Sequence, residues 1–154
     1  MPVKIIDGDL FETKANFICH QVNCQGRMGS GVAKQIRAKY PNVYADYQKA
    51  CTVGNGDPFW TFGHSQLVRC EDGKTVINMF AQSGYGYDGK LYTDYAAFQG
   101  CLNEIRDKVP QGETIAMPYK IGCGLGGGDW EIIRSYIENI LAPHYTVELW
   151  RKGV

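Results

Sequence analysis

The amino-acid sequence predicts an α/β sandwich, in which a largely parallel sheet carries helices on its faces. Two patterns alternate along the 154 residues: short apolar runs of strand length, and longer segments whose apolar residues recur at helical spacing. Strands that alternate with helices in this way are typical of an α/β architecture. Because no internal repeat, linker or low-complexity segment interrupts the pattern, we expect one domain over residues 1–154.

Six apolar runs have the length of strands. They cover residues 3–6, 17–23, 61–68, 75–80, 114–119 and 145–150. A turn-forming segment, residues 71–74, separates the third run from the fourth, so these two are expected to form a hairpin. Residues 83–89 are too rich in glycine and tyrosine for a regular element and are expected to form a surface loop.

Four segments have the apolar spacing of helices. In the first, Val32 and Ile36 share one face, and Pro41 closes the helix. The second is expected to begin with Asn42 as its N-cap and to end before residues 54–56.

The third and fourth helices begin at candidate N-cap residues. Thr93 or Asp94 can cap the third helix, and Asp129 can cap the fourth, which starts at Trp130. A short polar side chain at this position accepts a hydrogen bond from a free N–H group of the first turn. Asp129 is therefore interpreted as a cap and not as a catalytic carboxylate.

Two glycine-rich segments, residues 26–31 and 122–128, each stand between a predicted strand and a predicted helix. Glycine lets a ligand approach the backbone closely, and a helix start directs free N–H groups at what lies before it. In open α/β sheets such loops lie at the carboxyl ends of strands, where ligands bind. Two such loops could hold both phosphates of a diphosphate, which favours a nucleotide-sugar diphosphate or a dinucleotide.

Two other interpretations of the glycines stay open. Glycines after strands are often no more than tight turns. Gly122, Gly124 and Gly127 also satisfy G-x-G-x-x-G, with Glu148 about twenty residues on, as in an NAD-binding Rossmann domain. That fingerprint normally opens its domain, whereas only one helix and one strand are predicted after it here.

The composition excludes several classes of protein. The 16 acidic and 16 basic residues balance, so no broad basic field supports general nucleic-acid binding or membrane-surface binding. The six cysteines are scattered, without zinc-ligand spacing, and no apolar run has the length of a membrane span. We expect a cytoplasmic monomer with reduced thiols, no metal site and no resident cofactor.

Four short motifs occur in the order in which one known family carries them. They are residues 8–11 after the first strand, Asn23 at the end of the second, residues 29–33 at the first helix, and residues 118–130. On these motifs nearly the whole chain resembles the macro domain, the ADP-ribose-binding module. The resemblance implies a three-layer sandwich with a mixed six-stranded sheet between helices.

The resemblance also implies roles in an ADP-ribose site. Asp9, with Leu10 beside it, would accept a hydrogen bond from the adenine amino group, because that amine is a donor. Asn23 would hydrogen-bond the distal ribose. Two loops would hold the diphosphate from opposite sides, namely Gly29, Ser30, Gly31 and Val32 on one side and Gly122, Cys123, Gly124, Leu125, Gly126 and Gly127 on the other.

Within the family, the chain is similar to the branch with the terminal ADP-ribose glutamate hydrolases, the thymidine ADP-ribose hydrolases and the ADP-ribose-1''-phosphate phosphatase of yeast. That similarity implies His20 and Asn23 as catalytic residues. The chain departs from the branch at two places. Residues 80–83 lack the lysine that some of its hydrolases carry, and Gly126 stands where the glutamate hydrolases have an aspartate.

The sequence therefore leaves two functions open. The first is hydrolysis at the distal ribose of an ADP-ribosyl substrate, at an ester bond, a glycosidic bond or the 1''-phosphate. The second is a reader module that binds ADP-ribose or ADP-ribosylated macromolecules without turning them over.

Individual side chains also have two interpretations each. His20 can be a general acid or base, or a core histidine with satisfied hydrogen bonds. Cys123 can be a thiol activated by a helix N-terminus, or a small residue that packs. Tyr85 and Tyr87 can close over the ligand or lie on the domain's own surface, and Arg27 can contact phosphate or stay solvated.

Overall fold

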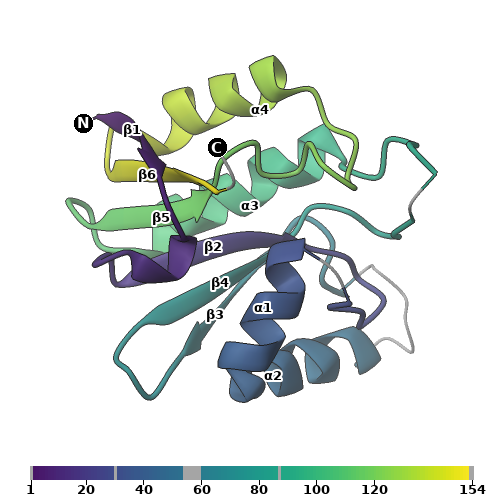
Figure 1. Ribbon diagram of the computed structural model, residues 1–154. Helices are drawn as coiled ribbons and strands as arrows, with labels where there is room; N and C mark the ends of the chain where they lie inside the picture. Colours follow the sequence, from purple (N-terminus) through teal and green to yellow (C-terminus); the bar gives the residue numbers. More distant parts are fainter. Residues whose placement is uncertain (1, 30, 54–59, 87, 153–154) are drawn as a thin grey trace.

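Six strands form one mixed sheet in the computed structural model, which describes residues 2–29, 31–53, 60–86 and 88–152 (Figure 1). The strands are β1 (Val3–Asp7), β2 (Phe17–Val22), β3 (Ser65–Arg69), β4 (Thr75–Phe80), β5 (Thr114–Pro118) and β6 (Thr146–Arg151). Their order is β1-β6-β5-β2-β4-β3, and each neighbouring pair is parallel except β3 and β4. The mixed six-stranded sheet and the hairpin are thus confirmed.

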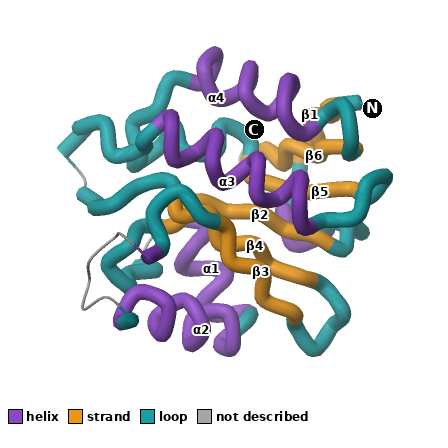
Figure 2. Tube along the Cα trace, turned by 180° about the vertical axis from the view of Figure 1, so that it is seen from behind, coloured by secondary structure: helices purple, strands orange, loops and turns teal. Residues whose placement is uncertain are grey.

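Helices cover both faces of the sheet (Figures 1 and 2). On one face lie α1 (Gly31–Lys39) and α2 (Pro41–Thr52), and on the other lie α3 (Tyr95–Lys108) and α4 (Trp130–Tyr136). Two short elements complete the set: a 3-10 helix, η1 (Leu10–Glu12), and a π-helical continuation of α4, η3 (Ile137–Leu141). This arrangement confirms the three-layer α/β sandwich.

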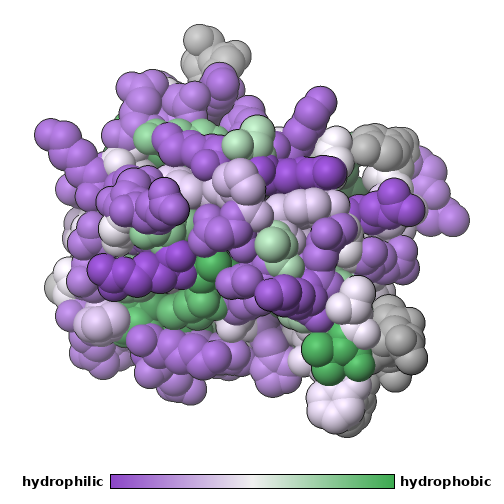
Figure 3. Space-filling view, turned by 90° about the horizontal axis from the view of Figure 1, so that it is seen from below, coloured by the Kyte–Doolittle hydropathy of each residue, from purple (hydrophilic) through white to green (hydrophobic). Residues whose placement is uncertain are grey.

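The alternation of side chains along each strand divides the buried residues between two cores. Ile18 and Val22 of β2 pack with residues of α1 and α2, whereas Cys19 packs with residues of α3 and α4. Successive side chains of a strand point to opposite faces, so a sheet covered on both sides needs apolar residues throughout. Outside these cores, hydrophilic side chains cover most of the surface seen from below (Figure 3).

Two boundary predictions were wrong. The strand predicted over residues 61–68 begins only at Ser65, because residues 61–64 form a turn in which Gly63 has a φ of +82°. Asn42 lies inside α2 and does not cap it, because Pro41 already takes the first helical position after Tyr40. The side chain of Asn42 donates a hydrogen bond to the carbonyl of Arg69 instead.

The remaining caps agree with the predictions. Asp94, and not Thr93, caps α3 by accepting a hydrogen bond from the N–H of Ala97, and Asp129 caps α4 by accepting one from Glu131. Residues 54–56, expected after α2, lie outside the described residues. Of the predicted surface loop 83–89, the described residues form no helix or strand, and Tyr87 lies outside them.

Candidate functional site

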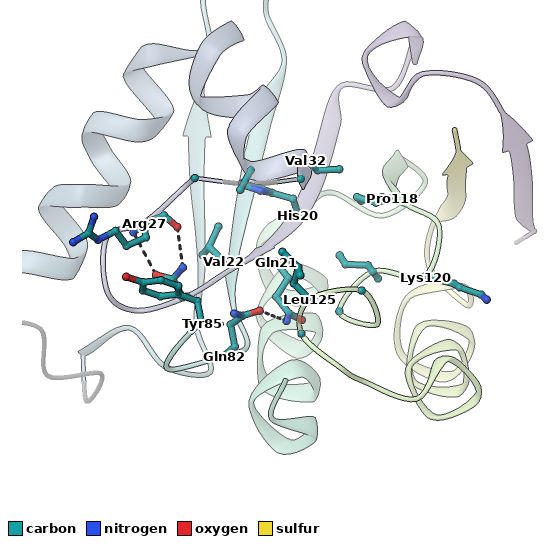
Figure 4. A pocket seen from close by; sticks show the side chains of 18 of the residues that line it. His20, Gln21, Val22, Arg27, Val32, Gln82, Tyr85, Pro118, Lys120 and Leu125 are labelled. Carbon is teal, nitrogen blue, oxygen red and sulfur yellow. Dashed lines mark hydrogen bonds between the residues drawn. The ribbon is translucent and has the colours of Figure 1, made fainter. Parts of the chain in front are cut away.

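A cavity of about 240 Å³ opens at the carboxyl ends of β2 and β5 (Figure 4). These two strands are parallel neighbours, so the glycine segments that follow them meet at one edge of the sheet. The predicted site residues that line the cavity are His20, Asn23, Gly29, Gly31, Val32, Gly122, Gly124, Leu125 and Gly126. The fold therefore brings both glycine segments to one cavity.

Other predicted site residues do not line this cavity. Leu10 is part of the core, and Cys123 and Gly127 belong to the second glycine segment without facing the cavity. Ser30 lies outside the described residues.

Asp9 lies apart from the cavity, at the start of η1. Its Oδ1 accepts a hydrogen bond from the N–H of Phe11 at 3.0 Å, and its Oδ2 lies 3.5 Å from Nζ of Lys152. The hydrogen bond from Phe11 is the main reason why the pKa of Asp9 is lowered. The side chain is therefore an ionised acceptor, which suits a contact to an amino group.

The second glycine segment offers N–H groups to the cavity. The amides of Gly122, Gly124, Leu125 and Gly126 have no hydrogen-bond partner among the described residues, and all four residues line the cavity. Across the cavity, Val32 lies in the first turn of α1, where N–H groups lack partners within the helix. Two sets of free N–H groups therefore flank the same space, an arrangement that favours an anion.

His20 lies on the wall of this cavity and is only 1% exposed. Its Nε2 is 2.5 Å from Oδ1 of Asn78. The direction of this hydrogen bond follows from a chain of bonds that begins at a backbone carbonyl. Gln66 donates to the carbonyl of Asp46, so its oxygen faces Asn78, whose NH₂ donates to Gln66 and whose oxygen faces His20. We therefore assign the ring proton to Nε2.

The other ring nitrogen of His20 is left with a lone pair. Nδ1 is buried and has no hydrogen-bond partner among the described residues. Burial lowers the pKa of His20 to about 4, although the hydrogen bond to Asn78 raises it in part. At neutral pH the ring is uncharged, so it can accept a hydrogen bond at Nδ1 but cannot act as a general acid. The interpretation as a core histidine with satisfied hydrogen bonds therefore holds for Nε2 and not for Nδ1.

Asn23 holds the turn that leads into the first glycine segment. Its Oδ1 accepts hydrogen bonds from the N–H of Gln25 at 2.9 Å and from the hydroxyl of Tyr47 at 2.7 Å, and its Nδ2 donates to the carbonyl of Arg27 at 2.8 Å. Because these partners include backbone groups of known polarity, the orientation of the amide is unambiguous. What remains for a ligand is the second hydrogen of Nδ2.

The thiol of Cys123 is not activated. Burial, the largest cause, and the charge of Asp129 together raise its pKa to about 11, although Lys120 lowers the pKa in part. The thiol donates a weak hydrogen bond to the carbonyl of Ile121 at 3.5 Å. Of the two interpretations of Cys123, the raised pKa favours the packing residue over the thiol activated by a helix N-terminus.

Tyr85 and Arg27 both line the cavity. The ring of Tyr85 is at its rim and the residue is 43% exposed. The side chain of Arg27 extends away from His20 and Gln21, as Figure 4 shows. Tyr85 is thus placed to touch a ligand, whereas the guanidinium of Arg27 faces solvent in this arrangement.

Several lining residues were not foreseen as site residues, among them Gln21, Gln82 and Lys120. Gln21 and Gln82 form a hydrogen bond to each other across the ends of β2 and β4. A glutamine inside a largely apolar strand, directly after His20, is a signal that could have found Gln21. Lys120 has a φ of +58°, which is unusual for a residue with a side chain and which no sequence pattern announces.

Charged groups are few at the cavity. Among the described residues that line it, none is an aspartate or a glutamate. Elsewhere in the described ranges, no cluster of three or more His, Cys, Asp or Glu side chains is arranged to hold a metal ion. In the same ranges, no helix combines the length and the apolar character that crossing a membrane requires.

Known proteins resemble this chain both in sequence and in fold. A family model described as Macro domain matches residues 19–137. The chain is 31% identical over 131 residues to a Mycobacterium tuberculosis protein named DNA ADP-ribosyl glycohydrolase; the match covers 83% of the chain and 35% of that protein. The chain thus spans about a third of the length of this relative.

A shorter relative matches along almost its whole length. It is a Debaryomyces hansenii protein named ADP-ribose 1''-phosphate phosphatase, 25% identical over 174 residues, with 94% of the chain and 97% of that protein covered.

Solved structures show the same fold. A Bacteroides thetaiotaomicron protein of unknown function has a TM-score of 0.84 at 27% identity, with 98% of each chain covered. The macrodomain of Mycobacterium tuberculosis DarG has a TM-score of 0.78 at 24% identity, with 97% of each chain covered.

Proposed function

Because the chain belongs to the macro domain family, we propose that its cavity binds ADP-ribose and that the protein hydrolyses a bond at the distal ribose of ADP-ribosyl substrates. The observation that carries the proposal is the cavity itself, flanked by two sets of free backbone N–H groups and walled at one point by a histidine with an unused nitrogen. A diphosphate can accept hydrogen bonds from both sides of such a space.

The chain has zero net charge, but its free backbone N–H groups can bind a dianionic group. Hydrogen bonds to a charged partner stabilise by about 1.5–3 kcal/mol each, more than bonds between neutral groups. The amides of Gly124, Leu125 and Gly126 and the first turn of α1 supply them without any lysine patch. Asp9, as an ionised acceptor, is suited to the adenine amino group at the other end of the ligand.

Hydrolysis at the distal ribose is supported by the names of the relatives. One is named for cleaving an ADP-ribosyl bond to DNA and the other for removing a 1''-phosphate. Both names describe a bond at the same end of ADP-ribose. The chain shares less than a third of its aligned residues with either relative, so the group attached to the ribose is left open.

In this proposal His20 orients the attacking water. Its Nδ1 accepts a hydrogen bond from the water, while Asn78 keeps the ring in the tautomer that leaves this lone pair free. The water oxygen forms a bond to the electrophilic atom of the scissile bond, which is C1'' of the ribose in a glycosidic bond, the carbonyl carbon in an ester or phosphorus in the 1''-phosphate. The bond from that atom to the leaving group breaks, and a proton of the water passes to solvent or to the leaving group. Because the pKa of His20 is about 4, the ring serves as an acceptor and not as the acid.

A reader module is the second candidate, and one observation favours it. The described residues that line the cavity include no carboxylate, and the amide of Asn23 is almost fully occupied by the chain itself. A cavity that has His20 on its wall and no carboxylate among its described lining residues can bind without catalysing.

A cytoplasmic monomer without general nucleic-acid binding is part of the proposal. All six cysteines are free thiols, as is usual in a reducing compartment, and the balanced charge supports neither a basic nor a membrane-binding surface. Light scattering after size-exclusion chromatography tests the monomer, and retention on heparin tests the charge argument.

Calorimetry with ADP-ribose tests the binding. The absence of measurable affinity would remove both candidate functions. A panel of ADP-ribosylated glutamate, serine and thymidine, together with ADP-ribose-1''-phosphate, then separates them, because a reader consumes none.

If one substrate is consumed, the role of His20 is tested with His20→Ala, and with His144→Ala as a control far from the cavity. Loss of turnover only in the first variant supports the mechanism, whereas full turnover in His20→Ala removes the histidine from it.

A further inference from the structure

Thr93 lies against the second glycine segment and is hydrogen-bonded to it at two points, Gly122 and Gly126. The residue is 2% exposed. Its hydroxyl donates a hydrogen bond to the carbonyl of Gly122 at 2.7 Å, and its N–H donates one to the carbonyl of Gly126 at 2.9 Å. The N–H of Tyr92 donates a second hydrogen bond to Gly126 at 2.8 Å. One short segment therefore tethers two points of the glycine loop.

These two tethers bracket the amides that face the cavity. The carbonyls of Gly122 and Gly126 belong to the peptide units before Cys123 and Gly127, and the N–H groups of those two residues are bonded to Lys120 and Gly124. Both flanking peptide units are thus held at both ends. The arc between them presents the unpaired N–H groups of Gly124, Leu125 and Gly126 to the cavity, without a partner among the described residues.

The side chain of Gln21 supports Thr93 with a hydrogen bond to its hydroxyl oxygen. Its Nε2 donates hydrogen bonds to Oγ1 of Thr93 at 2.8 Å and to Oε1 of Gln82 at 2.7 Å (Figure 4 draws the second). The single proton of Thr93 is already given to Gly122, so Thr93 can only accept from Gln21. Gln82 donates to the carbonyl of Gly84, so its oxygen must face Gln21. Two backbone carbonyls therefore set the direction of every bond in this network.

The loop lies so close to this network that only glycine fits at two positions. A Cβ on Gly126 would lie 2.5 Å from Oγ1 of Thr93 and 3.1 Å from Nε2 of Gln21. A Cβ on Gly122, whose φ is +77°, would lie 2.8 Å from Oε1 of Gln21. The same oxygen is buried without a partner among the described residues, which costs folding free energy. Such a cost, close to a ligand cavity, is typical of a network kept for function.

We propose that Thr93, supported by Gln21, is a positioning residue: it presets the glycine loop so that the free N–H groups converge on a phosphate of the ligand. The inference rests on the proposed function, because it assumes that the phosphate of ADP-ribose lies against this loop. In the free protein Thr93 already holds the second glycine segment in place. Less conformational entropy is therefore lost when the ligand binds.

The test uses Thr93→Val, which keeps the shape of the side chain and removes the hydroxyl. We expect affinity for ADP-ribose to fall about tenfold, since a loop that must be ordered on binding loses preorganisation. Affinity for adenosine, which has no phosphate, should be unchanged in an NMR titration. Thr93→Ser, which restores the hydroxyl, should recover most of the loss. If a substrate is turned over, KM should rise more than kcat falls.

The matched control is Ser65→Ala. Ser65 is another buried hydroxyl that donates to a backbone carbonyl, that of Cys101, at 3.0 Å, and it does not line the cavity. It should lower the melting temperature about as much as Thr93→Val does and leave affinity for ADP-ribose unchanged. Gln21→Met removes the support from the other side, and the same loss is expected from it if Thr93→Val does not fold.

The outcomes separate this inference from the proposed function. If the wild-type protein does not bind ADP-ribose, the proposed function fails. If the wild type binds and a folded Thr93→Val or Gln21→Met variant binds equally well, only the positioning role is overturned. An equal loss of adenosine and ADP-ribose affinity also overturns it, because the effect would not be confined to the phosphate.

Discussion

At the scale of single residues, His20 combines complete burial with an unused nitrogen. Its neutral form is imposed by burial and its tautomer by a hydrogen-bond chain that ends at the carbonyl of Asp46. An unsatisfied buried acceptor is costly, so a group that can satisfy it should be bound there. A ligand hydroxyl or a water that reaches the cavity wall would meet this requirement.

The low pKa of His20 predicts how stability depends on pH. The folded protein holds the ring neutral down to about pH 4, whereas the unfolded chain takes up a proton near its ordinary value of 6.5. Stability from this residue is therefore fully present above pH 6.5 and is lost as the pH falls toward 4, by about 3 kcal/mol in total. Urea unfolding at pH 7, 5.5 and 4.5 measures the loss.

Carboxylates also take up protons as the pH falls toward 4, so a variant is needed to separate the contribution of His20 to the pH dependence of stability. His20→Gln should show a shallower decline between pH 6.5 and 4 than the wild-type protein. Parallel declines in the two proteins would mean that the ring does not resist protonation in the folded state.

Gly126 is limited by its neighbours and not by its own backbone. The space beyond its Cα is occupied by the hydroxyl of Thr93 and the amide of Gln21, whereas a Cβ on Gly124 would meet nothing within 4 Å. We expect Gly126→Ala to lower the free energy of unfolding by about 1–3 kcal/mol through overpacking. Gly124→Ala, the matched control, should stay within about 0.5 kcal/mol of the wild type.

Chemical denaturation of the two variants measures the difference. Equal stabilities would show that the loop can move away from Thr93 at no cost, which would also weaken the positioning role proposed for that residue. The same crowding explains why a carboxylate cannot be added at position 126 without other changes.

At the scale of elements, the cap of α3 links the helix to the site. Asp94 accepts a hydrogen bond from the N–H of Ala97 at 2.8 Å and follows directly after Thr93. Asp94→Ala should lower the free energy of unfolding by about 1 kcal/mol. Asp107→Ala, an exposed carboxylate near the end of the same helix, serves as the control and should change it by less than about 0.5 kcal/mol.

Thermal or urea unfolding of the two variants tests the cap. A loss in Asp94→Ala no larger than that in Asp107→Ala would mean that the cap of Asp94 does not stabilise α3. The sequence left Thr93 and Asp94 as alternative caps. The structure separates them, because the N–H of Ala97 donates to Asp94, whereas the hydroxyl of Thr93 donates to Gly122 and accepts from Gln21.

At the scale of the whole molecule, the ligand should stabilise the fold. Both cores meet at β2, and the cavity lies at the end of that strand, so binding is coupled to global unfolding. At a concentration of ADP-ribose one hundred times its Kd, the stabilisation is about 2.7 kcal/mol. For a domain of this size that corresponds to a rise in Tm of about 5–10 °C.

Differential scanning fluorimetry checks this rise, with adenosine as the ligand control. A Tm that does not move at saturating ADP-ribose would contradict the proposed site. A smaller rise is expected for Thr93→Val at the same ligand concentration, since its affinity should be lower.

The sequence by itself determined the layer architecture, five of the six strands to within two residues, and the two glycine segments. These follow from local properties: apolar periodicity, turn composition and the freedom of the glycine backbone. It was wrong where a local preference met a competing one, as when Pro41 took the helix start from Asn42 and when Gly63 delayed β3.

Only the tertiary structure decided how these parts act together. Gln21 is far from Gln82 and Thr93 in the chain, and no local pattern predicts that the three form one hydrogen-bond network against the second glycine segment. The tautomer and pKa of His20 likewise depend on burial and on partners that the sheet supplies. Hydrogen bonding and desolvation depend on the residues that surround a group in the folded protein. The sequence shows only which residues are adjacent along the chain.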